Sequence, residues 1–150
     1  MAEQTPLNLN IQKIYLKDVS FESPQSPQVF GDEWKPEANV QVNTQAKKLG
    51  DTQYEAELTV TATVKQADKV VYLAEVKQAC VVQTNAEEQN LQKILLSYCP
   101  NMMFPYVQQT VATLSISGGF PVLTLQPINF DALLANSQQQ EGQEAGASVN

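Results

Sequence analysis

Residues 94–130 read ILLSYCPNMMFPYVQQTVATLSISGGFPVLTLQPINF and contain no charged residue, in a chain that otherwise carries a charge every few positions. A membrane-spanning helix needs about 20 nearly unbroken apolar residues. This stretch is instead interrupted by four prolines and by Asn101, Gln108 and Gln109. It is therefore predicted to be buried within a soluble fold, with the rest of the chain arranged around it.

The middle of this stretch has helical periodicity. Four apolar side chains recur at spacings of four and three: Met103, Val107, Val111 and Leu114. Asn101 is predicted to cap the start of the helix, Pro105 to fall in its first turn, and Gly118-Gly119 to end it. The other face is polar but uncharged, with Gln108, Gln109, Thr110, Thr113, Ser115 and Ser117. Because an exposed helix face usually carries Lys or Glu, this helix is expected to be buried on both sides, as it would be between protomers.

Four segments before residue 85 alternate apolar and polar side chains, which is typical of strands with one buried face. They cover residues 7–22, 38–43, 54–64 and 70–84, with turns predicted at 47–51 and 66–69. In the first, the apolar face is expected to comprise Leu7, Leu9, Ile11, Tyr15, Val19 and Phe21. Ile14 and Leu16 interrupt its polar face and hint at a second contact surface. Consecutive strands joined by turns predict an antiparallel sheet.

The helical segments follow the strands, and that order predicts an α+β domain with a four-stranded antiparallel sheet and helices packed on one face. A short helix is expected within residues 85–98, an extended segment at 120–128, and a last helix opened by Asn129. Residues 1–6 are predicted to be disordered, 7–136 to form one domain, and 137–150 to be a flexible acidic tail.

Composition excludes several functions for this chain of 150 residues. The net charge of −7 and a pI near 4.5 argue against a nucleic-acid partner, which would require Lys and Arg at the phosphates. The absence of histidine excludes Cys-His pairs, Ser-His-Asp triads and His-ligated metals. Two cysteines, Cys80 and Cys99, are too few for a disulfide framework or a zinc site, and Cys99 is expected to be inert packing. We therefore expect no metal, no cofactor and no enzyme activity.

Two further features bear on location and chemistry. The N-terminus, MAEQTPLNLN, lacks the positive and apolar regions of a secretory signal, so the chain is expected to be cytoplasmic.

Asp18 and Glu22 share the polar face of the first strand. Four residues of strand place them about 13 Å apart, whereas the carboxylates of a glycosidase pair lie within about 9.5 Å. These acids are therefore not predicted to be catalytic.

The loop at residues 23–37 is rich in proline and carries two aromatic residues, Phe30 and Trp34. Two readings remain open from the residues alone. The rings either pin the loop onto the core or line a binding groove, since loops held by a scaffold commonly carry binding residues.

Three strings give the chain a resemblance to a known family: KDVSFE at residues 17–22, CPNMMFPY at 99–106 and GGFPVLTLQPINFDAL at 118–133. They resemble, in order and spacing, the SecB family of bacterial protein-export chaperones, and the likeness covers all but the two ends. Cys80 is a departure, since it stands where the family has a small, glycine-rich stretch. The resemblance implies a homotetramer, built as a dimer of dimers, that holds unfolded precursor proteins in the cytoplasm and delivers them to the SecA ATPase. It implies no cofactor and no catalytic step, and some relatives also serve toxin-antitoxin systems.

The resemblance also implies roles for individual residues. The surface that docks SecA maps to Asp18, Glu22, Leu73 and Glu75. Unfolded polypeptide is expected at Phe30, Trp34, Phe104, Tyr106 and Phe130, together with the strand residues Ala74, Val76 and Gln78. The tetramer interface is expected at Met103, Val107 and Val111.

An alternative from another class is a carrier of a small apolar ligand, or a plain dimerisation module, built on the same sheet. The acidic residues Asp18, Glu22 and Glu75 discriminate between the two classes. A carrier has no use for them, so reversing their charge would leave its ligand binding intact.

Overall fold

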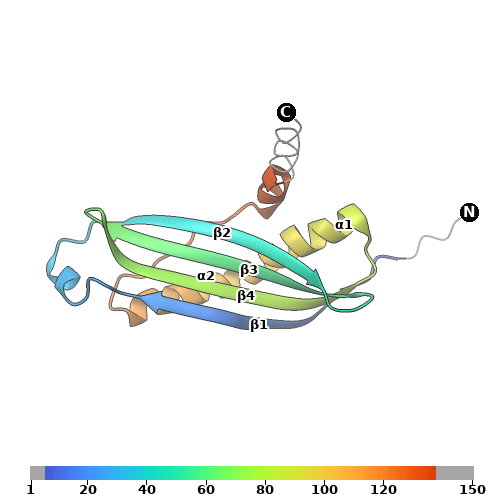
Figure 1. The fold of residues 1–150 in the computed structure, drawn as a ribbon, viewed down its shortest axis with the longest axis horizontal. Coiled ribbons are helices and arrows are strands. Elements are labelled where there is room, and N and C mark those ends of the chain that lie inside the picture. Colours follow the sequence, from blue (N-terminus) through green and yellow to red (C-terminus); the bar gives the residue numbers. More distant parts are fainter. Residues whose placement is uncertain (1–5, 138–150) are drawn as a thin grey trace, which may run out of the picture.

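Four antiparallel strands form a single sheet in the order β1-β4-β3-β2 (Figure 1). In this computed structural model, which describes residues 6–137, the strands are β1 (Leu9–Glu22), β2 (Glu37–Lys48), β3 (Gln53–Gln66) and β4 (Lys69–Thr84). The predicted sheet is confirmed, whereas residues 1–5 and 138–150, where the two tails are expected, lie outside the described residues.

The turn between β3 and β4 and the loop between β1 and β2 differ in length. Strands β3 and β4 are joined by Ala67 and Asp68, which have φ angles of 51° and 64°. Positive φ at both central residues is the geometry whose twist matches that of the flanking strands. The loop between β1 and β2 contains a short 3-10 helix, η1 (Gln28–Gly31), whose Val29 is buried.

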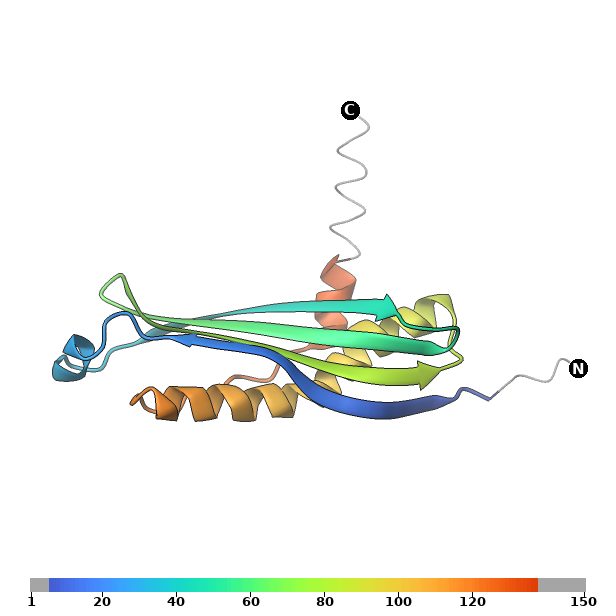
Figure 2. The ribbon, with the colours of Figure 1, turned by 60° about the horizontal axis from the view of Figure 1, so that its bottom comes forward.

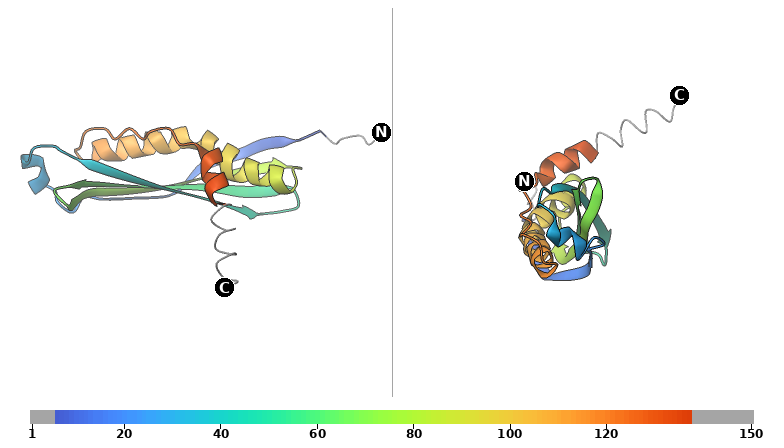
Figure 3. Two further views of the ribbon diagram at one scale, coloured as in Figure 1. Left: turned by 90° about the horizontal axis from the view of Figure 1, so that it is seen from above. Right: turned by 90° about the vertical axis from the view of Figure 1, so that its left-hand side faces the viewer.

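Helices cover one face of the sheet, which we call the inner face; the other is the open face. Helix α1 (Glu88–Lys93), the π-helical turn η2 (Ile94–Tyr98) and helix α2 (Cys99–Ser117) follow one another without leaving helical backbone angles. Figure 2 and the left view in Figure 3 show α2 running lengthwise along the sheet. No helix within residues 6–137 is long and apolar enough to cross a membrane.

The predicted start of the long helix is wrong. Asn101 does not cap it, because α2 begins at Cys99 and the helical backbone continues from η2. Pro100 occupies the first turn, and Pro105 lies inside the helix and not in its first turn. The wider π-helical turn just before Pro100 provides room for a residue that cannot donate a backbone hydrogen bond.

The predicted end of α2 is confirmed. Gly118 donates its backbone N–H to Leu114 at 2.9 Å, and Gly119 follows with a φ of 89°. A Cβ at Gly118 would lie 2.5 Å from the ring of Phe21 on β1. Glycine here therefore allows the end of the helix to pack directly on the sheet.

An extended segment is predicted at 120–128; residues 121–129 form neither helix nor strand, and their backbone is tied to α2. Gln108 Nε2 donates to the Leu125 carbonyl at 3.0 Å, and Ser115 Oγ accepts from the Leu123 N–H at 3.1 Å. These bonds account for two of the uncharged polar side chains of α2, Gln108 and Ser115, whereas Gln109, Thr113 and Ser117 are exposed. The last helix begins at Phe130, and Asn129 Oδ1 caps it by accepting from the Ala132 N–H at 3.0 Å.

The main core lies between α2 and the inner face. Met103, Val107 and Val111 are fully buried there with Leu58 and Val76. The periodicity therefore identified a buried face correctly, but the partner of that face is the sheet of the same chain. Where β4 meets α2, the thiols of Cys80 and Cys99 are free and buried. A hydrogen bond with Cys80 and burial raise the pKa of Cys99, as expected for packing residues.

Strand β1 corrects a second prediction. Its pairing with β4 shifts by one residue between Ile11 and Lys13 and again between Leu16 and Asp18. Each shift is a β-bulge that exchanges the two faces. Ile14 and Leu16 consequently point to the inner face, and Tyr15 points to the open face, the reverse of the predicted alternation.

Candidate functional site

The four predicted docking residues lie together on the open face. Glu22 is directly opposite Leu73 in the β1–β4 ladder, and Asp18 is opposite Lys77. Glu75 lies two positions from Leu73 on the same face of β4. Asp18 and Glu22 are exposed, whereas Leu73 and Glu75 are half-buried. The sheet therefore assembles one surface from two neighbouring strands, and the docking role of this surface remains a prediction.

A second group of charged side chains on the open face forms ion pairs within the group. Lys17 Nζ lies 2.9 Å from Glu55 Oε1 and also pairs with Glu57, while Lys47 Nζ lies 3.6 Å from Glu55 Oε1. Tyr15 donates its hydroxyl to Glu55, which is only 6% exposed. Glu55 and Glu57 are thus matched by two lysines and add little to the acidic surface.

Burial and hydrogen bonding act in opposite directions on Glu55. Burial alone raises its pKa, but hydrogen bonds from Tyr15 and Lys17 and the charges of Lys17 and Lys47 lower the pKa to about 2. Burial and the bond to Glu55 raise the pKa of Tyr15 to about 12. Glu55 is therefore ionised and Tyr15 neutral at neutral pH. Sequence reasoning missed this network because the bulges in β1 hid the orientation of Tyr15.

An aromatic cluster lies at the end of the sheet that carries η1. Phe120 contacts Tyr72, Phe30 and Trp34, with ring centroids 4.7, 5.3 and 5.6 Å apart, and Phe21 stacks on Tyr72 at 5.5 Å. Both loop aromatics pack on Phe120, as the first of the two readings expects, and a binding role for them stays a prediction. Trp34 is half-buried on the cluster, whereas Phe30 is 52% exposed.

An apolar groove continues from this cluster along strand β2. Its volume is about 510 Å³, and it lies between the inner face of β2 and the segment after α2. The lining residues are Ala38, Val40, Val42, Leu123, Thr124, Leu125, Gln126, Pro127, Ile128 and Leu133. Leu123 packs against both hydrophobic clusters. We call the aromatic cluster and the groove together the apolar path.

The other residues predicted to bind polypeptide lie elsewhere. Phe104 and Phe130 meet edge to face, with centroids 5.9 Å apart, and both are buried. Three more are buried on the inner face of β4: Ala74, Val76 and Gln78. Tyr106 is 47% exposed on the outer side of α2. Of the five residues expected to line the polypeptide groove, only Phe30 and Trp34 join the apolar path, and a role in polypeptide binding stays a prediction for all eight residues.

The predicted interface residues also need correction. Met103, Val107 and Val111 have no exposed surface in the single chain, so they have none to offer a second chain. The outer face of α2 is exposed instead and presents Tyr106 and Ile116, and Tyr98 at the end of η2 is exposed just before it. An interface between helices would have to use this outer face.

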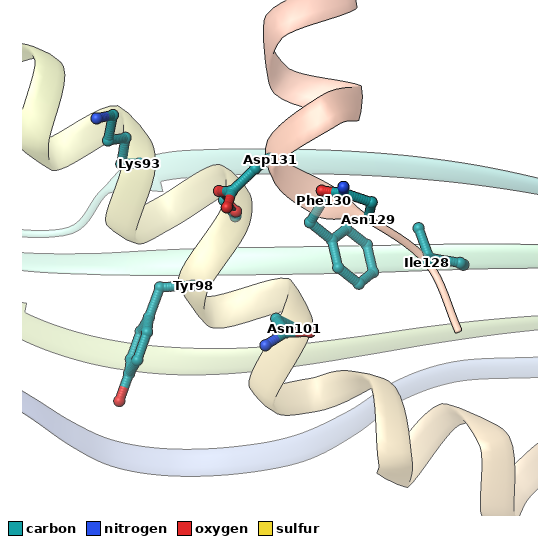
Figure 4. Close-up of a pocket in the computed structure, with 8 residues that line it drawn as sticks. Lys93, Tyr98, Asn101, Ile128, Asn129, Phe130 and Asp131 are labelled. Carbon is teal, nitrogen blue, oxygen red and sulfur yellow. Dashed lines mark hydrogen bonds between the residues drawn. The ribbon is translucent and has the colours of Figure 1, made fainter.

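A smaller pocket of about 320 Å³ lies where the last helix meets the helical segment α1–α2 (Figure 4). It is lined by Lys93, Ser97, Tyr98, Asn101, Ile128, Asn129, Phe130 and Asp131. Asp131 is the single carboxylate in this lining, and Ser97 donates a hydrogen bond to it. Within the described part of the chain, no cluster of three or more His, Cys, Asp or Glu residues could hold a metal.

Several residues of the apolar path were not predicted. Phe120, Leu123 and Ile128 belong to the uncharged stretch, and Val40 and Val42 form the apolar side of β2. A signal was present, because β2 has an apolar face and the segment at 121–128 is extended but broken by prolines. Such a segment covers an edge strand incompletely and leaves apolar surface open.

These features define an α+β protein with three acidic side chains, Asp18, Glu22 and Glu75, on its open face and an apolar path on its inner side. A family model described as "Preprotein translocase subunit SecB" matches residues 2–141. Protein-export protein SecB of Hahella chejuensis is 48% identical over 137 residues, which cover 90% of this chain and 86% of the relative. That of Alcanivorax borkumensis is 45% identical over 152 aligned residues, covering 98% and 97%. The chain therefore belongs to the SecB family of protein-export proteins.

A solved structure has the same fold. It is a SecB-like chaperone of Mycobacterium tuberculosis in complex with a ChAD peptide from the HigA1 antitoxin. The TM-score is 0.68 at 16% sequence identity, and the match covers 80% of this chain and 90% of that one. At this identity the likeness establishes the fold, and it confirms the predicted arrangement of a four-stranded sheet followed by a long helix.

Proposed function

We propose that this chain is an export chaperone that binds unfolded precursor polypeptides along the apolar path. The observation that carries the proposal is the continuity of that path. Exposed Phe30 and half-buried Trp34 lead through Phe120 and Leu123 into the groove beside Val40. An unfolded polypeptide exposes apolar side chains that a folded protein buries, so a long apolar path selects the unfolded state over any one sequence.

Strand β2 gives the path a second means of recognition. It is the last strand in the sheet order, so no strand within residues 6–137 pairs with one side of its backbone. An extended polypeptide lying in the groove can form main-chain hydrogen bonds with such an edge. These bonds do not depend on the client's sequence, which suits a protein that accepts many clients.

The acidic open face serves a different partner in this proposal. Asp18, Glu22 and Glu75 attract a basic segment of SecA, and Leu73 supplies an apolar contact beside them. The surface and the apolar path lie on opposite faces of the sheet, so client and SecA can be bound together. Delivery requires no cofactor and no catalytic step, and it takes place in the cytoplasm.

The functional particle is proposed to be a homotetramer, a dimer of dimers. The exposed side chains of the helical segment support this, because Tyr98 of η2 and Tyr106 and Ile116 of α2 are exposed and residues 94–130 carry no charge. Exposed apolar side chains with no charge among them favour association over solvation. The related Mycobacterium tuberculosis chaperone, solved with a peptide bound, is consistent with polypeptide binding on this fold.

The test compares one polypeptide in its native state and in a permanently unfolded variant of the same length. Binding of each is measured by calorimetry, and light scattering gives the mass of the complex. Tight binding of the unfolded form alone, on a particle four times the chain mass, supports the proposal. Equal binding of both forms, or of neither, would contradict it, and binding of small apolar ligands alone would favour the carrier.

A second measurement tests delivery separately. Asp18→Lys combined with Glu22→Lys is expected to weaken binding to purified SecA while leaving the affinity for the unfolded client unchanged. Unaltered SecA affinity would remove the docking role from the open face without affecting the chaperone proposal.

A further inference from the structure

Strand β1 contains one extra residue at Lys17. In the ladder with β4, Leu16 is opposite Gln78 and Asp18 is opposite Lys77, so Lys17 lies between two successive pairs. Residues two apart in a regular strand share a face, and Asp18 would then point to the inner face as Leu16 does. The bulge turns Asp18 to the open face instead. The acidic surface therefore depends on this single inserted residue.

The side chain of Lys17 is held by residues of a strand that is not adjacent to β1. Its ammonium group bonds to Glu55 and Glu57, which belong to β3, the second strand away. Strand β4 lies between β1 and β3. Its residue Ala79 is opposite Tyr15 in the β1–β4 pairing and opposite Glu57 in the β3–β4 pairing. Because alanine is small, side chains from β1 and β3 can meet across β4. Lys17 thus ties the edge strand to β3 at the bulge itself.

We propose that Lys17 is a positioning residue for the acidic surface: its ion pairs with Glu55 and Glu57 hold the bulge that places Asp18 and Glu22 on the open face. This inference rests on the proposed docking function and adds a residue to it. If Lys17 acted only through its charge, its removal would have the opposite effect on partner binding. Removing a cation beside Asp18 makes the surface more negative and would strengthen attraction to a basic partner, whereas loss of the bulge weakens it.

The first test is Lys17→Met, with affinity for purified SecA measured at low and at moderate salt. We expect binding to be roughly three- to tenfold weaker, the size of change typical of coupled neighbouring side chains. Lys17→Arg, which keeps both ion pairs, should restore most of the affinity. The matched control is Lys13→Met, which removes the same charge from the same strand. Lys13 forms no ion pair among residues 6–137, so this control should not weaken binding.

The second test asks whether Lys17 acts through Asp18. Asp18→Asn should weaken SecA binding less in the Lys17→Met background than in the wild type, because the carboxylate is already displaced. Purely additive effects would overturn the proposal, as would unchanged or tighter binding by Lys17→Met alone. Should Lys17→Met fail to fold, Ala79→Val keeps every charge but separates Lys17 from Glu57, and it should weaken SecA binding in the same way.

The charge-reversal variant shows whether the docking surface itself is wrong or only the positioning role of Lys17. If Asp18→Lys with Glu22→Lys leaves SecA affinity unchanged, the docking surface itself is wrong, and the role of Lys17 with it. If charge reversal weakens binding while Lys17→Met and Ala79→Val do not, the surface stands and the positioning role of Lys17 is rejected.

Discussion

The indole of Trp34 stacks on the ring of Phe120, with centroids 5.6 Å apart and planes inclined by 27°. One residue comes from the loop after β1 and the other from the segment after α2. This contact therefore builds the start of the apolar path from two distant parts of the chain, and it leaves Trp34 half-buried with surface still available to a client.

Replacing Trp34 by alanine tests the aromatic end of the path. We expect Trp34→Ala to weaken binding of an unfolded client about tenfold, as is usual for a buried aromatic anchor, while the particle mass stays the same. Calorimetry and light scattering measure the two quantities. Leu49→Ala removes an exposed apolar side chain in the β2–β3 turn, away from the path, and should have no effect. Unchanged client affinity in Trp34→Ala would make the indole a packing residue only.

A charge in the groove tests its β2 side. Val40→Glu places a carboxylate on the inner face, where an apolar client side chain would have to desolvate it, and we expect client binding to fall about tenfold or more. Gln41→Glu adds the same charge to the next residue, which points to the open face. Only the first variant should weaken client binding. If both variants weakened client binding equally, the effect would come from the added charge in general, and the groove would not be the binding site.

Glu55 predicts how stability depends on pH. Its pKa is about 2 in the folded chain, against a reference value of 4.5, so the ionised form stabilises the fold. This contribution is fully present above pH 4.5 and is lost as the pH falls through the folded value. We expect Glu55→Gln to lower the free energy of unfolding at pH 7 by about 1–2 kcal/mol and to reduce the loss of stability in acid.

Urea denaturation at several pH values measures both effects. Glu33→Gln is the matched control, since Glu33 pairs with Lys35 at 3.5 Å but is largely exposed; such pairs contribute little. An acid stability profile identical in the wild type and in Glu55→Gln would show that the network with Tyr15 and Lys17 does not stabilise the fold.

Gly118 tests the packing of α2 on β1. Its φ of −76° is open to any residue, but an added Cβ would lie 2.5 Å from the Phe21 ring. We expect Gly118→Ala to destabilise the chain by about 1–3 kcal/mol through overpacking. Gly31→Ala meets no atom within 4 Å and should change stability by less than about 0.5 kcal/mol. Thermal unfolding of both variants provides the comparison, and equal stability would show that Phe21 moves aside freely.

The sheet could be predicted because β3 and β4 alternate without interruption and are joined by short turns. The bulges in β1 could not be predicted. In the sequence, a bulge appears only as an apolar residue at a position where the alternation expects a polar one. Ile14 and Leu16 are such residues, and from the sequence alone they indicate a second surface, whereas the structure shows a change of register.

Periodicity also indicates that a helix face is buried without identifying what covers it. For Met103, Val107 and Val111 it predicts an interface between chains, whereas the sheet of the same chain covers them. The candidate site was predicted best where its residues are close in sequence, as for Asp18 and Glu22. The partners Tyr72 and Phe120 come from elements far from the loop, so only tertiary packing joins them to Trp34.

The central claim, that the apolar path holds unfolded polypeptide, is tested most directly by photo-crosslinking. An unfolded client carrying a benzophenone side chain at successive positions is bound to the wild-type chain and irradiated, and the adducts are mapped by mass spectrometry. Adducts concentrated at Trp34, Phe120, Leu123 and Val40, and lost in competition with unlabelled client, are the result predicted here. Adducts confined to the open face of the sheet, or spread evenly over the surface, would contradict the account.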